Sequence, residues 1–173
     1  MKRHKDHPMA LKPASTQVTP IDDVLISSVV VASRESPRKR IIQPLHKEGA
    51  ASLQRMLNAI QPGSYIRPHR HVPERAESII VLSGAIQFFT FSEQGAVEQS
   101  LQLKAGSTQI GIDIEGGVWH SFAALEADTV LFEVKPGPYD PESDKEFARW
   151  APEEYSPEVG DYLNQLMDCV TEA

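Results

Sequence analysis

The chain has 173 residues, enough for one domain with a hydrophobic core and too few for two comfortable ones. Apolar residues make up 40% of the sequence, and no apolar run approaches the roughly 18 residues of a membrane-spanning helix, so we predict a soluble globular protein. The net charge of -7 gives no general reason to bind nucleic acid. Cys169 is the only cysteine, which excludes an internal disulfide and a cysteine-based zinc site.

Residues 1–20 predict a disordered N-terminal arm. Pro8, Pro13 and Pro20 lie there among polar neighbours with little apolar surface to bury. The arm lacks the apolar segment of a signal peptide, so we expect a cytoplasmic protein. His4 and His7 belong to this arm and are expected to be solvated.

Residues 21–139 show short β-type runs separated by Gly, Pro and polar turns. Their spacing of about ten residues is typical of an antiparallel sandwich or barrel. Residues 54–60 match helical spacing and also alternate, and we favour a strand there, with room for a short helix over 48–53. The other runs are 24–31, 79–82, 85–91, 97–103, 108–112, 118–123 and 129–134.

Residues 140–173 predict a helical C-terminal extension, which follows a stiff Pro-rich link. We expect helices over 143–150 and 157–170. Ser143 can cap the first helix, and Glu146 completes a capping box three residues later. The extension would cover one end of the β domain or form a subunit interface.

A histidine-rich segment carries the clearest chemical signal. His69 and His71 are two residues apart, so on a strand both face the same way and can bind one ion. Glu77 opens the next run, and His120 lies on a later one. Three imidazoles and a carboxylate suit a divalent transition metal (manganese, iron, nickel or zinc) better than calcium or magnesium. Glu74 is an alternative carboxylate in the same short loop.

This spacing resembles the first motif of the cupin superfamily, Gly-x5-His-x-His followed by Glu-x6-Gly. The matching residues are Gly63, His69, His71, Glu77 and Gly84. The downstream glycine favours Glu77 as the carboxylate ligand. The loop between the second histidine and the glutamate holds five residues, where three or four are usual.

The second cupin motif is only partly present. Gly117 and His120 match it, whereas Gln109, Glu115 and Ala124 replace the usual Gly, Pro and Asn. The hairpin that this motif normally forms is therefore uncertain from the sequence.

Three segments resemble the WbuC family of cupin-fold metalloproteins more narrowly: RMLNAIQPGSYIRPHRH (55–71), GVWH (117–120) and FEVKPGPY (132–139). The similarity covers residues 36–153. It implies an all-β double-stranded β-helix, or jelly-roll barrel, with one metal held by His69, His71, Glu77 and His120. It also implies a link to surface-polysaccharide and amino-sugar pathways. It implies no particular reaction, because such barrels host isomerases, dioxygenases, decarboxylases and simple binders.

Residues near the histidines are candidates for substrate binding and proton transfer. Strand alternation places Tyr65 and Arg67 on the histidine face. Arg67 could bind a carboxylate or phosphate bidentately, or instead pair with Glu133. Glu77 or Tyr65 could move protons, and Tyr139 could lie over the pocket mouth or simply pack.

Arg34, Arg38 and Arg40 belong to the one dense basic cluster of the domain. These side chains could form a rim that attracts an anionic substrate, or a solvated loop.

The predicted function follows from an open metal site. Four protein ligands leave room for water or substrate on an ion that accepts about five or six. We expect an isomerase, epimerase or lyase that acts on a small anionic, sugar-like molecule. The alternatives are an iron dioxygenase and a non-catalytic metal-dependent binder. We also expect a homodimer that binds neither nucleic acid nor membrane.

Overall fold

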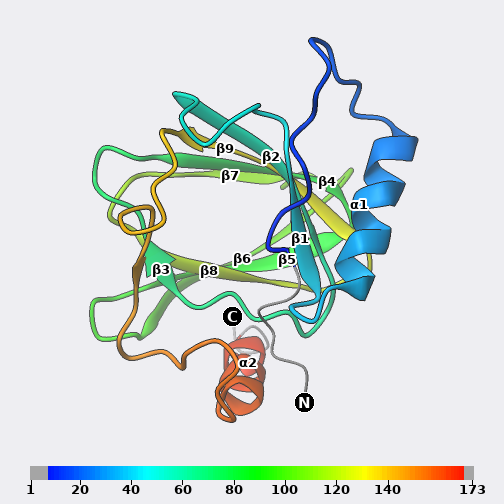
Figure 1. The fold of residues 1–173 in the computed structure, drawn as a ribbon. Helices are drawn as coiled ribbons and strands as arrows, with labels where there is room; N and C mark the ends of the chain where they lie inside the picture. Colours follow the sequence, from blue (N-terminus) through cyan, green and yellow to red (C-terminus); the bar gives the residue numbers. More distant parts are fainter. Residues whose placement is uncertain (1–7, 170–173) are drawn as a thin grey trace.

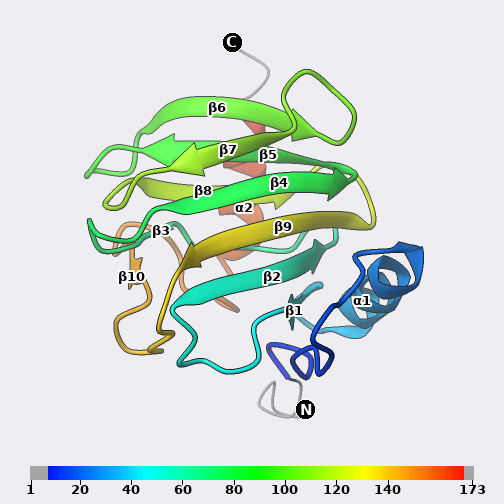
Figure 2. The ribbon, with the colours of Figure 1, turned by 90° about the horizontal axis from the view of Figure 1, so that it is seen from above.

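The computed structural model describes residues 8–169, which form two five-stranded antiparallel sheets that face each other (Figures 1 and 2). The strand order is β1-β2-β9-β4-β7 in the first sheet and β10-β3-β8-β5-β6 in the second. From β4 onward the chain passes repeatedly between the sheets, as in a jelly roll, which confirms the predicted all-β class. The strands are β1 (Arg40–Pro44), β2 (Leu53–Ile60), β3 (His69–Arg70), β4 (Glu77–Ser83), β5 (Ala85–Phe91), β6 (Val97–Lys104), β7 (Gly111–Ile114), β8 (Trp119–Ala124), β9 (Thr129–Pro136) and β10 (Glu146–Phe147).

Most of the predicted strands are present. β5 has the predicted bounds, and β2 confirms the strand interpretation of the ambiguous segment before Pro62. The run predicted over 108–112 is displaced, since β7 begins at Gly111. Strand β1 was not predicted.

The predicted strand over 24–31 is wrong, because this segment lies within helix α1 (Asp23–Glu35). The Asp22 carboxylate caps the helix by accepting a hydrogen bond from the Leu25 N–H at 3.0 Å. Val29 and Val30 are buried in a cluster that includes Leu57 of β2. Packing against the outer face of the first sheet thus overrides the β preference of the valines (Figure 2).

The predicted helix over 143–150 is also wrong. Glu146 and Phe147 form β10, which pairs with Arg70 and His69 of β3. The Ala148 N–H extends this pairing by donating to the Pro68 carbonyl at 2.9 Å. The short strand β3 thereby gains backbone hydrogen-bond partners along its free edge. A helix could not supply them, because its own N–H and C=O groups are already paired within the helix. The second predicted helix is present as α2 (Val159–Asp168).

Part of the expected N-terminal arm contacts the barrel. Ala10 forms a parallel bridge with Ile42, and the Leu11 N–H donates to the Ile42 carbonyl at 2.8 Å. Residues 10–14 are thus hydrogen-bonded to β1, which differs from the expectation of disorder. His4 and His7 lie outside the described residues.

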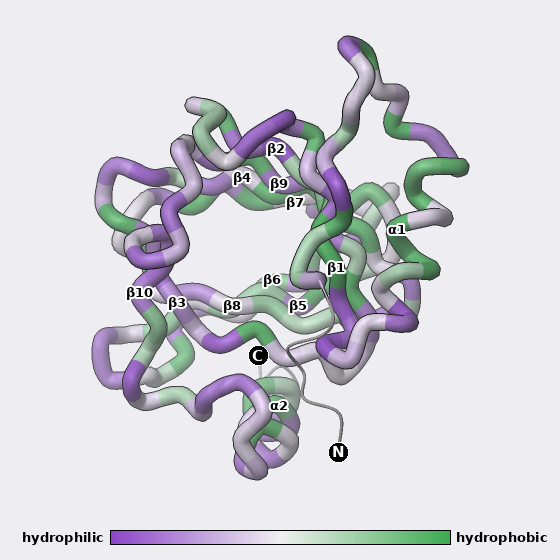
Figure 3. The backbone as a smooth tube through the Cα atoms, viewed as in Figure 1, coloured by the Kyte–Doolittle hydropathy of each residue, from purple (hydrophilic) through white to green (hydrophobic). Residues whose placement is uncertain are grey.

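The apolar residues form three clusters. One fills part of the space between the sheets and includes Phe88 and Leu131, and the second lies under α1. The third lies on the outer face of the second sheet, where α2 and Trp150 cover Phe89. Figure 3 shows hydrophobic and hydrophilic stretches mixed along the strands, whereas the chain near β10 is largely hydrophilic. Neither described helix is long and apolar enough to cross a membrane.

Gly84 joins β4 to β5 in a left-handed conformation, with φ of +74°. A Cβ at this position would overlap the Thr129 hydroxyl and backbone. Gly106 has a similar φ of +70°, but nothing lies within 4 Å of its Cβ position. A substitution at Gly106 would therefore cause backbone strain alone, whereas the same substitution at Gly84 would cause both backbone strain and steric overlap.

We expect Gly106→Ala to lower the free energy of unfolding by about 1–2 kcal/mol, because alanine disfavours positive φ. Gly84→Ala should cost about 1–3 kcal/mol more, since Thr129 must move. Urea unfolding of both variants measures the difference. Equal losses of unfolding free energy in the two variants would show that Thr129 can move aside without an energetic penalty.

Candidate metal centre

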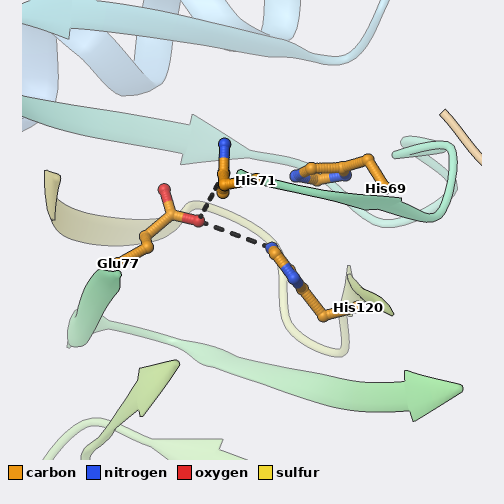
Figure 4. A group of neighbouring side chains, drawn as sticks. All are labelled: His69, His71, Glu77 and His120. Atoms are coloured by element: carbon orange, nitrogen blue, oxygen red, sulfur yellow. Dashed lines mark ion pairs between the residues drawn. The ribbon is translucent and has the colours of Figure 1, made fainter. Parts of the chain in front are cut away.

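Four side chains predicted from the sequence converge between the two sheets. His69, His71, Glu77 and His120 each offer one ligand atom, and these four atoms lie within 4.8 Å of one another. Figure 4 shows the imidazoles and the carboxylate pointing toward a common centre. All four residues are at most 5% exposed. Glu74 is exposed in the preceding turn, so the structure brings Glu77, and not the alternative carboxylate, to the histidines.

The strand pairing explains this convergence. His69 of β3 lies directly opposite His120 of β8, and their rings are 4.5 Å apart. His71 follows β3, where its carbonyl accepts a hydrogen bond from the Gly117 N–H at 2.9 Å. Glu77 begins β4 of the opposite sheet. Both sheets therefore contribute ligands, as a site within a barrel requires.

Backbone carbonyls orient all three imidazoles. Each Nδ1 lies within hydrogen-bond distance of a carbonyl oxygen, which fixes Nδ1 as the protonated nitrogen and leaves the lone pair on Nε2. The acceptors for His69, His71 and His120 are the carbonyls of Arg67, Asp144 and Val118, at 3.0, 2.5 and 2.9 Å. The Nε2 atoms are thus available to bind a metal.

Two of these Nε2 atoms lie near the Glu77 carboxylate, but neither nitrogen forms a hydrogen bond with a described residue. Nε2 of His71 and of His120 lie 3.3 and 3.5 Å from Oε2 of Glu77. Both nitrogens are buried and lack a hydrogen-bond partner within the described part of the chain. Nitrogen lone pairs directed at an ionised oxygen repel it, so a cation or shared protons must lie between them.

The electrostatics favour the protonation states that bind metal. Burial would raise the pKa of Glu77, but hydrogen-bond donation from His120 and His71, which would require a proton on Nε2 when no metal is bound, lowers it well below its ordinary value. Burial and the charge of Lys145 lower the pKa of His69, so this imidazole is neutral at pH 7. Ionised carboxylate and neutral imidazole are the forms that coordinate an ion. This buried cluster therefore suits a metal ion.

Further charged groups line the interior near Glu77, and the sequence analysis did not identify their roles. Glu133 of β9 accepts a hydrogen bond from Asn58 at 2.8 Å, and burial together with the Glu77 charge raises its pKa to about 7. Lys135 pairs with Asp144 at 2.8 Å. Alternation along β9 could have revealed both residues, because Glu133 and Lys135 share the inward face with Leu131.

Arg67 lies against the C-terminal extension. Its Nη2 donates to the Ala148 carbonyl at 2.8 Å, and its Nη1 is 3.7 Å from a Glu153 carboxylate oxygen. The alternative ion pair with Glu133 is wrong, since Glu153 takes that place. The Arg67 guanidinium therefore contacts the C-terminal extension, and Arg67 reaches the clustered side chains through its carbonyl, which accepts from Nδ1 of His69.

The two tyrosines singled out from the sequence also contact other parts of the chain. The Tyr65 hydroxyl donates to the Pro152 carbonyl at 2.9 Å, and its ring packs edge-on against Tyr162. Burial raises the pKa of Tyr65 above its ordinary value. Tyr139 is 48% exposed, and its N–H donates to the Gly49 carbonyl.

The basic cluster is neutralised by acidic partners. Arg34 forms two hydrogen bonds with Asp128. Arg38 and Arg40 both bind Glu154, at 2.9 and 2.8 Å. Arg38 and Arg40 are therefore neither solvated nor free to attract an anion, and they join their segments to the C-terminal extension. The Arg34 side chain is 58% exposed and joins α1 to Asp128.

Comparisons with known proteins give a partial family match and weak structural similarity, and they define no activity. A model of a domain of unknown function, DUF6016, matches residues 21–103. No curated protein matches the sequence. The cupin domain of Schizosaccharomyces pombe Cnp3 is similar at 14% identity and a TM-score of 0.44, over 57% of this chain and 64% of that domain.

Two enzymes are similar at comparable levels. Cellulomonas parahominis L-ribose isomerase shares 18% identity with a TM-score of 0.49, over 65% of this chain and 70% of the isomerase. Bacillus subtilis oxalate decarboxylase shares 19% identity with a TM-score of 0.47, over 67% of this chain and 28% of the decarboxylase. The chain thus spans less than two thirds of the Cnp3 domain and of the decarboxylase. The strand order of the two sheets itself shows a jelly-roll fold.

The Arg38–Glu154–Arg40 contact predicts a pH-dependent contribution to stability. Burial would raise the pKa of Glu154, but the two arginines lower it below its ordinary value of 4.5. A lowered carboxyl pKa stabilises the fold above the unfolded pKa, and the effect is lost as pH falls through the folded pKa. Glu154→Gln should therefore cost about 1–3 kcal/mol at pH 7.

Urea unfolding at pH 7 and at decreasing pH below 4.5 tests this expectation, because the difference from the wild type should narrow on acidification. Glu153→Gln is the matched control, since Glu153 is 82% exposed and 3.7 Å from Arg67. A pH-independent difference for Glu154→Gln would contradict the electrostatic explanation.

Proposed function

We propose that this chain is a WbuC-like cupin that binds one divalent transition metal. The ligands are Nε2 of His69, His71 and His120 and the carboxylate of Glu77. The observation that carries the proposal is the pair of buried Nε2 atoms that face Glu77 without a hydrogen-bond partner among residues 8–169. Carbonyl acceptors on all three Nδ1 atoms support it, because metal-bound histidines are commonly oriented in this way.

The donor set is suited to manganese, iron, nickel or zinc. Such an ion supplies Lewis acidity, which polarises a bound oxygen and lowers the pKa of a bound water. The protein supplies a dry, shaped surrounding, since all four ligands are buried between the sheets.

We further propose an isomerase, epimerase or lyase that acts on a small anionic, sugar-like molecule. Glu133 supports this reaction class, because its pKa of about 7 lets it accept and return a proton near neutral pH. Lys135 and Lys145 add positive charge to the same interior. In this proposal Glu133 replaces Tyr65 as the proton carrier, while Tyr65 and Arg67 hold the C-terminal extension through Pro152 and Ala148.

The proposal includes a cytoplasmic homodimer linked to surface-polysaccharide synthesis. The pathway rests on the resemblance to the WbuC family alone. The dimer is supported by Ile80, Leu82 and Ile110, which are exposed on or beside the strand pair β4 and β7.

Metal binding should raise the melting temperature of the wild type. Saturation at about 100 times the dissociation constant stabilises a protein by about 2.7 kcal/mol. His69→Ala should lose this response and bind metal more than about 100-fold more weakly. Calorimetry and elemental analysis on protein purified without an affinity-tag metal measure both effects.

His46→Ala is the matched control, because His46 is buried but hydrogen-bonded to the Arg55 backbone. It should retain wild-type metal content. A stoichiometric ion that persists in His69→Ala would overturn the assignment of this ligand.

Glu133→Gln should keep the metal and lose turnover by about 100-fold or more, because the amide cannot carry the proton. Nuclear magnetic resonance of metal-loaded protein with a panel of sugar acids measures product formation. Oxygen consumption by the iron-loaded protein would instead identify a dioxygenase. Binding without any product, in wild type and variant alike, would identify a non-catalytic binder.

A further inference from the structure

Residues 140–148, here called the crossing segment, pass from β9 to the edge of the second sheet beside the histidines. Figure 1 shows this part of the chain as the orange trace next to β3. Its first turn is closed by hydrogen bonds from the N–H groups of Ser143 and Asp144 to the Asp140 carbonyl. Its other end is fixed by β10 and by the Ala148 N–H. The segment is therefore held at both ends around Asp144 and Lys145.

Asp144 links the middle of the crossing segment to the candidate metal centre through ion pairs and a hydrogen bond. Its carboxylate is buried, with Oδ2 at 2.8 Å from the Lys135 ammonium and Oδ1 at 3.5 Å from the Arg75 guanidinium. Its carbonyl accepts the hydrogen bond from Nδ1 of His71. The residue that follows, Lys145, is consequently placed close to the metal ligands.

The Lys145 ammonium lacks an acidic partner in the described part of the chain, whereas the nearby Lys135 and Arg75 both pair with Asp144. Lys145 is half-buried, yet among residues 8–169 it forms neither a hydrogen bond nor an ion pair. Its charge acts on His69, Glu77 and Glu133 through space. Burial lowers the pKa of Lys145, and the carboxylates of Glu77, Glu133 and Asp144 raise it only through space, with no ion pair to a described residue. A buried ammonium without a contacting anion is unfavourable, so this arrangement favours an anionic guest.

Metal binding would strengthen this preference. The carboxylate of Asp144 is already shared by Lys135 and Arg75, so it cannot neutralise Lys145. A divalent ion would engage the Glu77 carboxylate and would leave the interior with an excess of positive charge. A carboxylate group on the guest would reduce this excess of positive charge.

We infer that Lys145 binds the carboxylate of a small hydroxy acid whose oxygen atoms also reach the metal. This inference deepens the proposed function and rests on the metal site defined there. It assigns the anion-binding role to a residue of the crossing segment in place of Arg67, whose guanidinium is occupied by Ala148 and Glu153.

The test uses the full chain loaded with cobalt(II), whose visible absorption changes when a ligand enters the coordination sphere. D-Glucuronate is the anionic probe, glycolate is a smaller one, and D-glucose is the neutral counterpart of glucuronate. Lys145→Met should weaken glucuronate binding by at least about tenfold, because a charge-assisted hydrogen bond is lost. The response to glucose and the cobalt content should not change.

Lys145→Arg should retain most of the affinity, since the positive charge remains. Lys47→Met is the matched control, because Lys47 is exposed on the loop between β1 and β2. Lys145→Gln replaces the methionine variant if the latter does not fold, as judged by thermal unfolding.

The outcomes separate the two proposals. Absence of cobalt uptake by the wild type would overturn the metal site and, with it, this inference. Cobalt uptake with equal glucuronate affinity in wild type and Lys145→Met would overturn the role of Lys145 and leave the metal site intact. Failure of the cobalt-loaded wild type to bind either glucuronate or glycolate would also overturn the anion site.

Discussion

Three imidazoles and one carboxylate are buried together with their lone pairs directed at one another, and much of the architecture serves this arrangement. Pairing of β3 with β8 sets His69 against His120, and the facing sheet supplies Glu77. Such a group of acceptors is unfavourable unless a positive charge lies among them. The folded structure thus requires positive charge at this place, as a cation or as shared protons, and this charge explains why so polar a cluster can exist between two sheets.

The space between the sheets is divided between apolar and polar contents. The apolar part is packed with Phe88, Ile79, Leu131 and their neighbours, which stabilise the barrel by burial. The polar part contains Glu133 and the four candidate metal ligands, along with paired lysine and aspartate side chains. The dry apolar part lowers the local polarity and so strengthens every charge interaction in the polar part.

The C-terminal extension completes the barrel and does more than cover its surface. β10 adds to the edge of β3, the Asp144 carbonyl orients His71, and Lys145 brings a charge to the interior. Farther along, Trp150 and α2 cover the aromatic outer face of the second sheet. Changes in the extension are therefore expected to affect both stability and the chemistry at the candidate centre.

The amino-acid sequence alone was sufficient to predict the β class, the strand at 54–60 and the four clustered side chains, because period-two alternation and motif spacing are local properties. It misassigned 24–31, where valines prefer strands but sheet packing selects a helix, and 143–150, where an unpaired edge strand selects β10 over a capped helix. It could not identify the surroundings of Arg67 or Lys145, because ion pairs between distant segments are decided by tertiary packing. Local pattern thus determined which residues meet at the centre, and long-range burial and charge pairing decided which groups surround them.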